Sequence, residues 1–352
     1  MKRYSSIEIL RFLTSVSVLL YHYRHFFSPY NIFSINVYEN TKKDLPFFDI
    51  IDWLYAYGFY GVHIFYTISG FVFAYVYLSS PKQTTFKEFS VNRVARLYPL
   101  HFATLLFVAF MQIIYISNYG ESQFGFINDF YHFILQIFFI SSWGFESGHS
   151  FNFPIWSVSI EMGIYILFFI LLKYLQKYNL IFVLILLTIL TFIHKLEIYN
   201  SLFTECARLF FSGVVVFYLY ERFILRKYVL IILGLLLFLA SFYGNFKTYV
   251  FCPAILIIFL NFEMTIKKDS LKKIFNNLGN MTYSLYLLHV PTQLIITLVV
   301  NKIFDSSEIF YNHFFFIFYF LLLFILASIT FSLYEKPLNN YVRKTLLKKN
   351  NK

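Results

Sequence analysis

The chain has 352 residues, of which 59% are hydrophobic and 23% aromatic, and only 13% are charged. Soluble domains usually contain about 25% charged residues, so this composition excludes an ordinary soluble protein and predicts a polytopic membrane protein. The formal net charge of +11 would suit a nucleic-acid partner, but the positions of the basic residues, given below, argue against one. Cys206 and Cys252 fall in apolar segments, where core packing is expected rather than a disulfide or a metal site.

Ten hydrophobic segments predict an all-α bundle of ten transmembrane helices, since about 20 apolar residues cross a bilayer. The segments lie at 7–26, 58–78, 97–116, 154–172, 180–195, 205–220, 228–243, 248–263, 281–301 and 312–334. An eleventh segment, 128–142, is shorter and contains more polar residues, so it is expected to be re-entrant or interfacial. Ten spans place both termini on the same side of the membrane.

The basic residues indicate which side that is. With the N-terminus in the cytoplasm, most of the 29 lysines and arginines fall in cytoplasmic loops and in the C-terminal tail, as the positive-inside rule requires. The stretch 117–153 has neither lysine nor arginine, which is typical of an outer loop. The sequence therefore predicts cytoplasmic termini, a membrane domain over 1–340 and a basic cytoplasmic tail over 341–352. No signal-peptide cleavage site is evident, so the first span is expected to be retained. Topology explains the positive charge, and no nucleic-acid partner is expected.

The first segment, 7–26, contains two ionisable residues, Arg11 and His22. On a helix, eleven residues span about 16 Å and return to within about 20° of the starting direction, so both side chains share one face. Burying an arginine in lipid costs at least about 2.5 kcal/mol, so this face is expected to look into protein or a water-filled cavity. The alternative is that Arg11 reaches the membrane interface and His22 is an incidental polar residue.

Two further groups of residues are candidates for chemistry. Arg93 and Arg96 are three residues apart and share a face if helical, where they could bind phosphates bidentately or simply anchor a cytoplasmic membrane edge. Glu161 lies within an apolar span, where a carboxylate is costly unless it is paired or solvated. It could meet His22 and charge the imidazole for work as a base, or it could form a structural ion pair between helices.

The remaining polar and small residues of the spans have structural interpretations. Gly61, Ser69 and Gly70 favour close helix packing, and His63 is expected to be structural. Glu205 and Arg208, three residues apart, are expected to pair with each other. His289 precedes Pro291 by two residues and either lines the same cavity as His22 or satisfies the helix kink at the proline. The sequence lacks HExxH, CxxC and GxSxG motifs and a Walker loop, which disfavours metal catalysis and a serine-hydrolase mechanism.

Taken in order, these stretches resemble the integral-membrane acyltransferase-3 family, which includes enzymes that O-acetylate bacterial surface polysaccharides. The matching features are Arg11 with His22, GVHIFYTISGF at 61–71, NRVARLYPL at 92–100, WSVSIEMGIY at 156–165, GNMTYSLYLLHVP at 279–291 and YEKP at 334–337. Asn92 stands where the family often has another basic residue. No counterpart of the esterase-like C-terminal domain of some members is expected.

The resemblance implies an O-acyltransferase in the bacterial cytoplasmic membrane. An acyl group would pass from cytoplasmic acyl-CoA, usually acetyl-CoA, to a hydroxyl of a surface polysaccharide or lipid-linked sugar, with membrane lipids as neighbours and no metal. It implies His22 as catalytic base, Arg11 as its partner in the motif and Arg93 and Arg96 at the donor side; Glu161 also belongs to the pattern. Ser69, Trp156 and His289 lie in the same motifs and are weaker candidates for substrate binding.

Two other classes of function remain open at this point. A transporter or flippase for a lipid-linked sugar would use the same intramembrane charges as a permeation path. Many transporters are built from internal repeats, and none is apparent in this chain. A sensor or scaffold would neither transfer nor transport a substrate.

Overall fold

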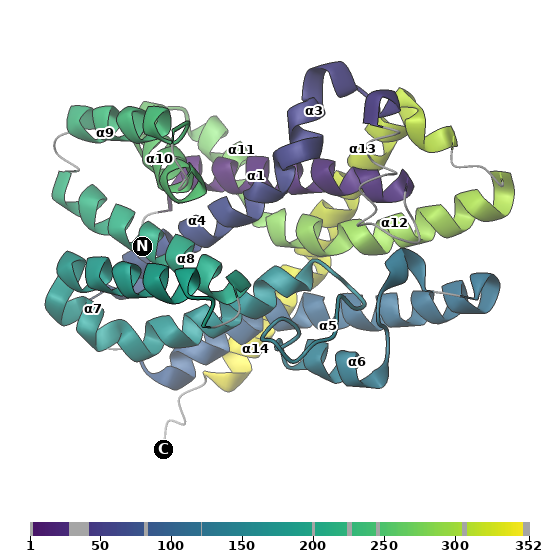
Figure 1. Cartoon of the computed structure of the whole chain (residues 1–352), viewed down its shortest axis with the longest axis horizontal. Coiled ribbons are helices and arrows are strands. Elements are labelled where there is room, and N and C mark those ends of the chain that lie inside the picture. Colours follow the sequence, from purple (N-terminus) through teal and green to yellow (C-terminus); the bar gives the residue numbers. More distant parts are fainter. Residues whose placement is uncertain are drawn as a thin grey trace. The chain divides into compact units, whose positions relative to one another are not determined.

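The computed structural model describes residues 3–27, 42–80, 84–120, 122–198, 201–223, 227–243, 247–304 and 308–347. These residues form helices joined by turns and short loops, with no strand among them, which confirms the all-α prediction (Figure 1). In a membrane, a helix satisfies its own backbone hydrogen bonds, and this explains why apolar segments fold in this way. The helices divide into two compact units, each assembled from three stretches of the chain.

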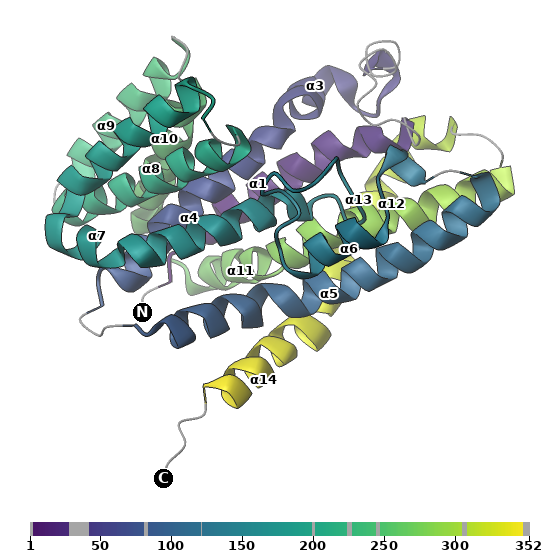
Figure 2. The same cartoon turned by 60° about the horizontal axis from the view of Figure 1, so that its bottom comes forward.

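Unit 1 comprises residues 1–14, 60–86 and 160–280. Its elements are the start of α1 (Ser5–Tyr23), α4 (Gly61–Tyr77), most of α7 (Ile155–Lys195), α8 (Ser201–Phe223), α9 (Lys227–Ala240), α10 (Lys247–Phe262), the short 3-10 turn Glu263–Thr265 and α11 (Asp269–Asn280). Helices α8, α9 and α10 lie together in both views (Figures 1 and 2).

Small residues bring α4 and α8 close together in unit 1. A Cβ atom added at Gly70 would lie 1.7 Å from the carbonyl oxygen of Phe210, and one added at Gly213 would lie 2.0 Å from that of Thr67. Each glycine thus meets the backbone of the opposite helix, an arrangement common in membrane helix pairs. The packing interpretation of Gly70 is therefore confirmed.

Helix α7 contains two of the predicted spans, 154–172 and 180–195. Asn179 interrupts it with φ 51° and ψ −138°, which are not helical angles. The rings of Tyr174 and Phe182 stack with centroids 5.7 Å apart, whereas eight residues of straight helix rise about 12 Å. The chain therefore folds back sharply at Asn179.

Unit 2 comprises residues 15–59, 87–159 and 281–352. Its elements are the end of α1, short 3-10 turns at Arg24–Phe27, Lys42–Asp44, Gly58–Tyr60, Gln123–Gly125 and Glu308–Tyr311, and α3 (Phe48–Tyr57), α5 (Phe86–Tyr119), α6 (Phe130–Ile137), α12 (Thr282–Phe304), α13 (His313–Thr330), the π-helical turn Phe331–Glu335 and α14 (Lys336–Leu346). Helix α12 packs on α13, and α6 lies beside α5 in both views (Figures 1 and 2).

Seven helices of the described residues are long and apolar enough to cross a membrane. Five of the predicted segments correspond to α4, α5, α8, α10 and α12, one corresponds to α13 and two fall within α7. The other two segments form helices that are not among the seven. The first segment forms α1, which contains several polar residues, and 228–243 contains α9, which has only 14 residues. The segment 128–142 contains the eight-residue helix α6, which is too short to span. The number ten and the cytoplasmic location of the termini stay predictions, as does the domain boundary at residue 340, which falls inside α14.

Candidate active site

Helix α1 contains both residues that the sequence singled out first. It runs without interruption from Ser5 to Tyr23, so Arg11 and His22 lie on one helix, as predicted. The division between the two units falls between Thr14 and Ser15, so Arg11 belongs to unit 1 and His22 to unit 2.

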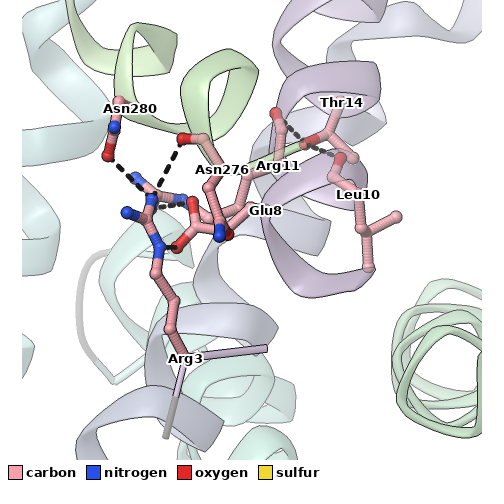
Figure 3. Close-up of polar contacts among 7 residues, drawn as sticks. All are labelled: Arg3, Glu8, Leu10, Arg11, Thr14, Asn276 and Asn280. Carbon is pink, nitrogen blue, oxygen red and sulfur yellow. Dashed lines mark hydrogen bonds and ion pairs between the residues drawn. The ribbon is translucent and has the colours of Figure 1, made fainter. Parts of the chain in front are cut away.

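Arg11 shares the carboxylate of Glu8 with Arg3 in unit 1 (Figure 3). Arg11 Nη1 donates to Glu8 Oε2 at 3.2 Å, and Arg3 Nε donates to Glu8 Oε1 at 3.0 Å. Arg3 Nη2 also donates to the carbonyl oxygen of Asn276 at 3.2 Å and to Asn280 Oδ1 at 2.7 Å, both on α11. Arg11 is therefore held by a carboxylate within the protein.

The same carboxylate lies directly against the end of α11. A Cβ atom at Gly279 would lie 2.1 Å from Glu8 Oε2, so only glycine leaves room for the carboxylate there. A second carboxylate, that of Glu263, binds the first turn of α1, where its Oε2 accepts a hydrogen bond from the backbone N–H of Ser6 at 2.7 Å. A carboxylate at the first turn of a helix complements the positive end of the helix dipole. The start of α1 is thus fixed by acidic side chains.

His22 is 5% exposed and lies among other imidazoles in unit 2. Its Nδ1 atom is 2.7 Å from Nε2 of His289 on α12. The rings of His22 and His289 meet edge to edge, with centroids 4.9 Å apart and planes 26° apart. The ring of His25 stacks on that of His22 with centroids 4.7 Å apart. The sequence interpretation missed His25, although its spacing of three residues from His22 predicts a shared face.

Asn152 bonds the backbone carbonyl that Pro291 leaves without a partner in α12. Proline has no backbone N–H, so the carbonyl of Leu287 loses its helical partner. Asn152 supplies one, because its Nδ2 donates to the Leu287 oxygen at 3.1 Å. Gln293, two residues past the proline, donates from Nε2 to the carbonyl oxygen of His22 at 2.8 Å. Of the two interpretations of His289, the structure therefore favours proximity to His22 over satisfaction of the kink.

Aromatic side chains enclose the histidines on one side. Phe153 contacts the His22 ring with centroids 5.8 Å apart and forms a buried cluster with Phe124, Phe126 and Val290. The partly buried Trp156 packs against this cluster. Three candidates from separate motifs, His22, Trp156 and His289, are thus gathered in unit 2.

The two arginines expected at the donor side lie on α5. Arg93 and Arg96 are both partly buried and three residues apart within the helix, as predicted. The segment that follows them receives hydrogen bonds from tyrosines of two other motifs. Tyr283 Oη donates to the carbonyl oxygen of Leu97 at 2.7 Å, and Tyr334 Oη to that of Pro99 at 3.3 Å.

Next to these tyrosines lies a buried carboxylate, Glu335, which belongs to the motif YEKP at 334–337 but was not among the predicted site residues. Glu335 is 2% exposed, and its Oε2 accepts a hydrogen bond from Ser284 Oγ at 2.7 Å. It ends a π-helical turn, a feature that often occurs at functional sites. Without knowledge of the fold, the sequence does not show that Glu335 faces inward.

Glu161 and Ser69 belong to unit 1 and are partly buried on α7 and α4. Glu161 acts electrostatically on Cys206 of α8. Its meeting with His22, which lies in unit 2, stays a prediction. Cys206 and Cys252 are free and buried, as expected for core residues.

Glu205 and Arg208, expected to pair with each other, have other contacts in unit 1. Glu205 Oε1 lies 3.6 Å from Nε2 of His63, and the guanidinium of Arg208 stacks 3.6 Å from the ring centroid of Tyr249. The two residues also interact electrostatically with each other along α8, so each combines the predicted interaction with a contact to a neighbouring helix, α4 for Glu205 and α10 for Arg208.

The site thus offers a buried imidazole with a second imidazole as its hydrogen-bond partner, which is the arrangement of a general base with an orienting group. Among the described residues, no group of three or more His, Cys, Asp and Glu side chains could hold a metal ion.

The comparisons with curated proteins and with solved structures gave no match. A family model described as an acyltransferase domain, Acyl_transf_3, matches residues 4–333. This range contains every site residue predicted from the sequence, whereas Glu335 lies just beyond it. The chain therefore belongs to the acyltransferase-3 family and is a membrane acyltransferase.

Proposed function

We propose that this acyltransferase moves an acetyl group from acetyl-CoA to a hydroxyl of a cell-surface or lipid-linked glycan, in the cytoplasmic membrane of a bacterium. The single observation that carries the proposal is the contact between His22 and His289, because it gives a buried side chain the surroundings of a general base. The family membership supplies the acyl transfer. The aromatic residues beside His22 would exclude bulk water, which otherwise competes as an acceptor.

The reaction needs one proton to move. In the proposal, His22 Nε2 removes the proton of the acceptor hydroxyl, and the oxygen attacks the thioester carbon. The tetrahedral intermediate then expels the thiolate of CoA, which takes the proton from His22. One C–O bond forms and one C–S bond breaks, so the reaction requires no oxidant and no metal.

Arg93 and Arg96 would bind phosphates of the CoA nucleotide, since guanidinium groups bind phosphate bidentately. The thioester on its extended arm would then reach toward His22, past Arg11, which lies about 16 Å further toward the start of α1. Glu161 is proposed to assist from unit 1, and Ser69 and Trp156 to contact the acceptor.

The test is transfer of radiolabelled acetyl groups from acetyl-CoA to a glycan acceptor by purified protein in nanodiscs, with mass spectrometry of the acceptor for added acetyl. His22→Ala should lower the rate by about 10²–10⁴-fold, the usual contribution of a general base. His194→Ala is the matched control, because that histidine lies at the end of α7 in unit 1, where its ring bonds Thr204. Wild-type transfer by His22→Ala, or no transfer by the wild type to any hydroxyl acceptor, contradicts the proposal.

The proposed donor site predicts a different change in the kinetic constants. The double substitution of Arg93 and Arg96 by glutamine should raise the KM for acetyl-CoA much more than it lowers kcat, because the contacts are to a part of the donor that does not react. An unchanged KM would mean that the arginines only anchor α5 at the membrane edge.

A further inference from the structure

We propose that His289 is the positioning residue for His22, taking the place that a carboxylate occupies in most histidine-based catalytic sites. The proposal rests on the function proposed above and goes beyond it by naming the group that orients the base. Its basis is the 2.7 Å contact between Nδ1 of His22 on α1 and Nε2 of His289 on α12, two side chains that are both buried.

The contact leaves room for one proton between the two nitrogens. If His289 donated that proton, the Nδ1 atom of His22 would be the acceptor, and a neutral His22 would hold its own proton on Nε2. Such an imidazole could not take a proton from substrate at Nε2. If His22 donates from Nδ1, its Nε2 atom carries the free electron pair and can act as the base. The proposal assigns this second arrangement, in which His289 Nε2 is the acceptor.

The same contact persists through the reaction. When His22 Nε2 takes the proton of the hydroxyl, the ring becomes an imidazolium with a proton on both nitrogens. The Nδ1–H continues to donate to His289, now as a charge-assisted hydrogen bond, which is stronger than a neutral one. His289 therefore stabilises the state that forms during proton transfer without itself changing its number of protons.

A neutral orienting group suits this position. A buried carboxylate would have to be removed from water and paired, at high energetic cost in a membrane. An imidazole can be uncharged at neutral pH, so its burial costs only its hydrogen bonds. The His22 ring is further held by stacking on His25 and by contact with Phe153. These contacts leave Nδ1 aimed at His289.

The position of His289 is fixed by the structure of α12. His289 is fully buried, and the free carbonyl produced by Pro291 is taken by Asn152 rather than by the imidazole. Gln293 on the same helix donates to the carbonyl of His22 at 2.8 Å, which gives α12 a second contact with the end of α1. The ring of His289 is therefore available to His22. Two contacts, one from His289 and one from Gln293, fix the position of α12 along the end of α1.

The experiment compares three substitutions of His289 in the full-length protein. Glutamine can place an amide oxygen near the position of Nε2 and accept the proton from His22. Asparagine is too short to do so, and leucine has no acceptor. Leucine and asparagine should lower kcat by about 10- to 100-fold with KM for acetyl-CoA unchanged, the range expected for loss of a hydrogen bond to a charged group. Glutamine should retain most of the wild-type kcat.

Coupling to His22 separates positioning from general stability. If His289 acts only through His22, adding His289→Leu to His22→Ala should cause little further loss, because groups that act as a unit are not additive. His101→Gln is the matched control, since it removes another fully buried imidazole of unit 2, one that bonds the carbonyl oxygen of Gln136 at 2.8 Å. Its effect on transfer should add to that of His22→Ala.

The outcomes distinguish the two proposals. Equal kcat for the glutamine, asparagine and leucine variants, or additive losses with His22→Ala, overturns the role of His289 and leaves His22 as the base. Full activity of His22→Ala overturns the proposed function itself. Loss of coupling to His289 together with strong coupling between His22 and Glu161 would assign the orienting role to the carboxylate instead.

Discussion

Replacing Glu8 by glutamine tests whether the shared carboxylate holds Arg11 in place. Glu8 accepts hydrogen bonds from Arg3 at 3.0 Å and from Arg11 at 3.2 Å. Glutamine has nearly the same shape, but it carries no charge and has a single acceptor oxygen. Its NH₂ group would face one of the two guanidinium groups as a second donor. At most one arginine can therefore keep its partner in the variant.

The expected loss of stability follows from the exposure of the three side chains. A hydrogen bond to a charged group contributes about 1.5–3 kcal/mol when it is shielded from water, and an exposed ion pair about 0.2–1 kcal/mol. The Glu8 side chain is 12% exposed, that of Arg11 21% and that of Arg3 43%. The energy of the hydrogen bond to Arg11 is therefore expected to lie between the two ranges, and the energy of the hydrogen bond to the more exposed Arg3 in the lower range. We expect the free energy of unfolding to fall by about 2 kcal/mol in total.

Thermal unfolding in detergent, followed by size-exclusion chromatography, measures this loss as a decrease in Tm of a few degrees. Asp269→Asn is the matched control, because it removes an ion pair with Lys272 of similar length, 3.0 Å, whose carboxylate is 94% exposed. The control should leave the Tm within the error of measurement. Glu8→Gln should also lower acetyl transfer, and Glu8→Gln added to Arg11→Gln should be no worse than Arg11→Gln alone. Equal Tm values for Glu8→Gln and Asp269→Asn would refute the reasoning.

Two further predictions concern the helix contacts of each unit. Gly213→Ala should lower the free energy of unfolding by about 1–3 kcal/mol, measured as a decrease in Tm, because the new methyl group would lie 2.0 Å from the Thr67 carbonyl oxygen and neither backbone can yield locally. The second prediction concerns Asp129, which caps α6 outside the candidate spans. Hydrogen bonds from the backbone N–H and the ring of His132 hold the pKa of the Asp129 carboxyl below its usual value. The protection of the α6 amides from hydrogen exchange should therefore be complete above the ordinary aspartate pKa of about 3.9 and should be lost only as the pH falls through the lowered pKa of Asp129. The variant Asp129→Asn still caps the helix but does not titrate, so its α6 amides should not lose protection as the pH falls.

The fold could be predicted where local composition decides it. A run of about 20 apolar residues must become a helix in a membrane, because every backbone group needs a partner within the chain. The positions of α8 and α10 follow from this rule with no knowledge of their neighbours, although α8 extends a few residues beyond the predicted segment at each end. The rule says less about α7, where a single residue, Asn179, turns the chain within one helical segment. A break of this size leaves almost no trace in a hydropathy pattern.

The site could be predicted only in part, because its contacts join residues far apart in the chain. The pattern of α1 indicated His22 as a candidate, since an ionisable residue within a membrane span is costly and usually has a functional role. His289 lies 267 positions away, and only the packing of α12 against the end of α1 brings the two nitrogens to 2.7 Å. The sequence interpretation instead named Glu161 as a possible partner of His22, because a carboxylate within an apolar span is costly unless it is paired or solvated. Glu335 was not predicted as a site residue, because it follows the last apolar segment in the sequence and only the structure shows that it is buried at the end of the π-helical turn.

The contrast between the two halves of α1 suggests how this helix avoids the cost of burying charge. Near its start, the charge of Arg11 is balanced by Glu8, and the pair remains partly exposed, so neither ion is stripped fully of water. Near its end, His22, His25 and His289 are almost completely buried, and all three are groups that can be neutral. A permanent charge in that second position would need a buried counter-ion, whose own desolvation would offset most of the attraction. Placing His22 there means that a charge forms only when the imidazole takes a proton, and its hydrogen-bond partner is already in position when it does.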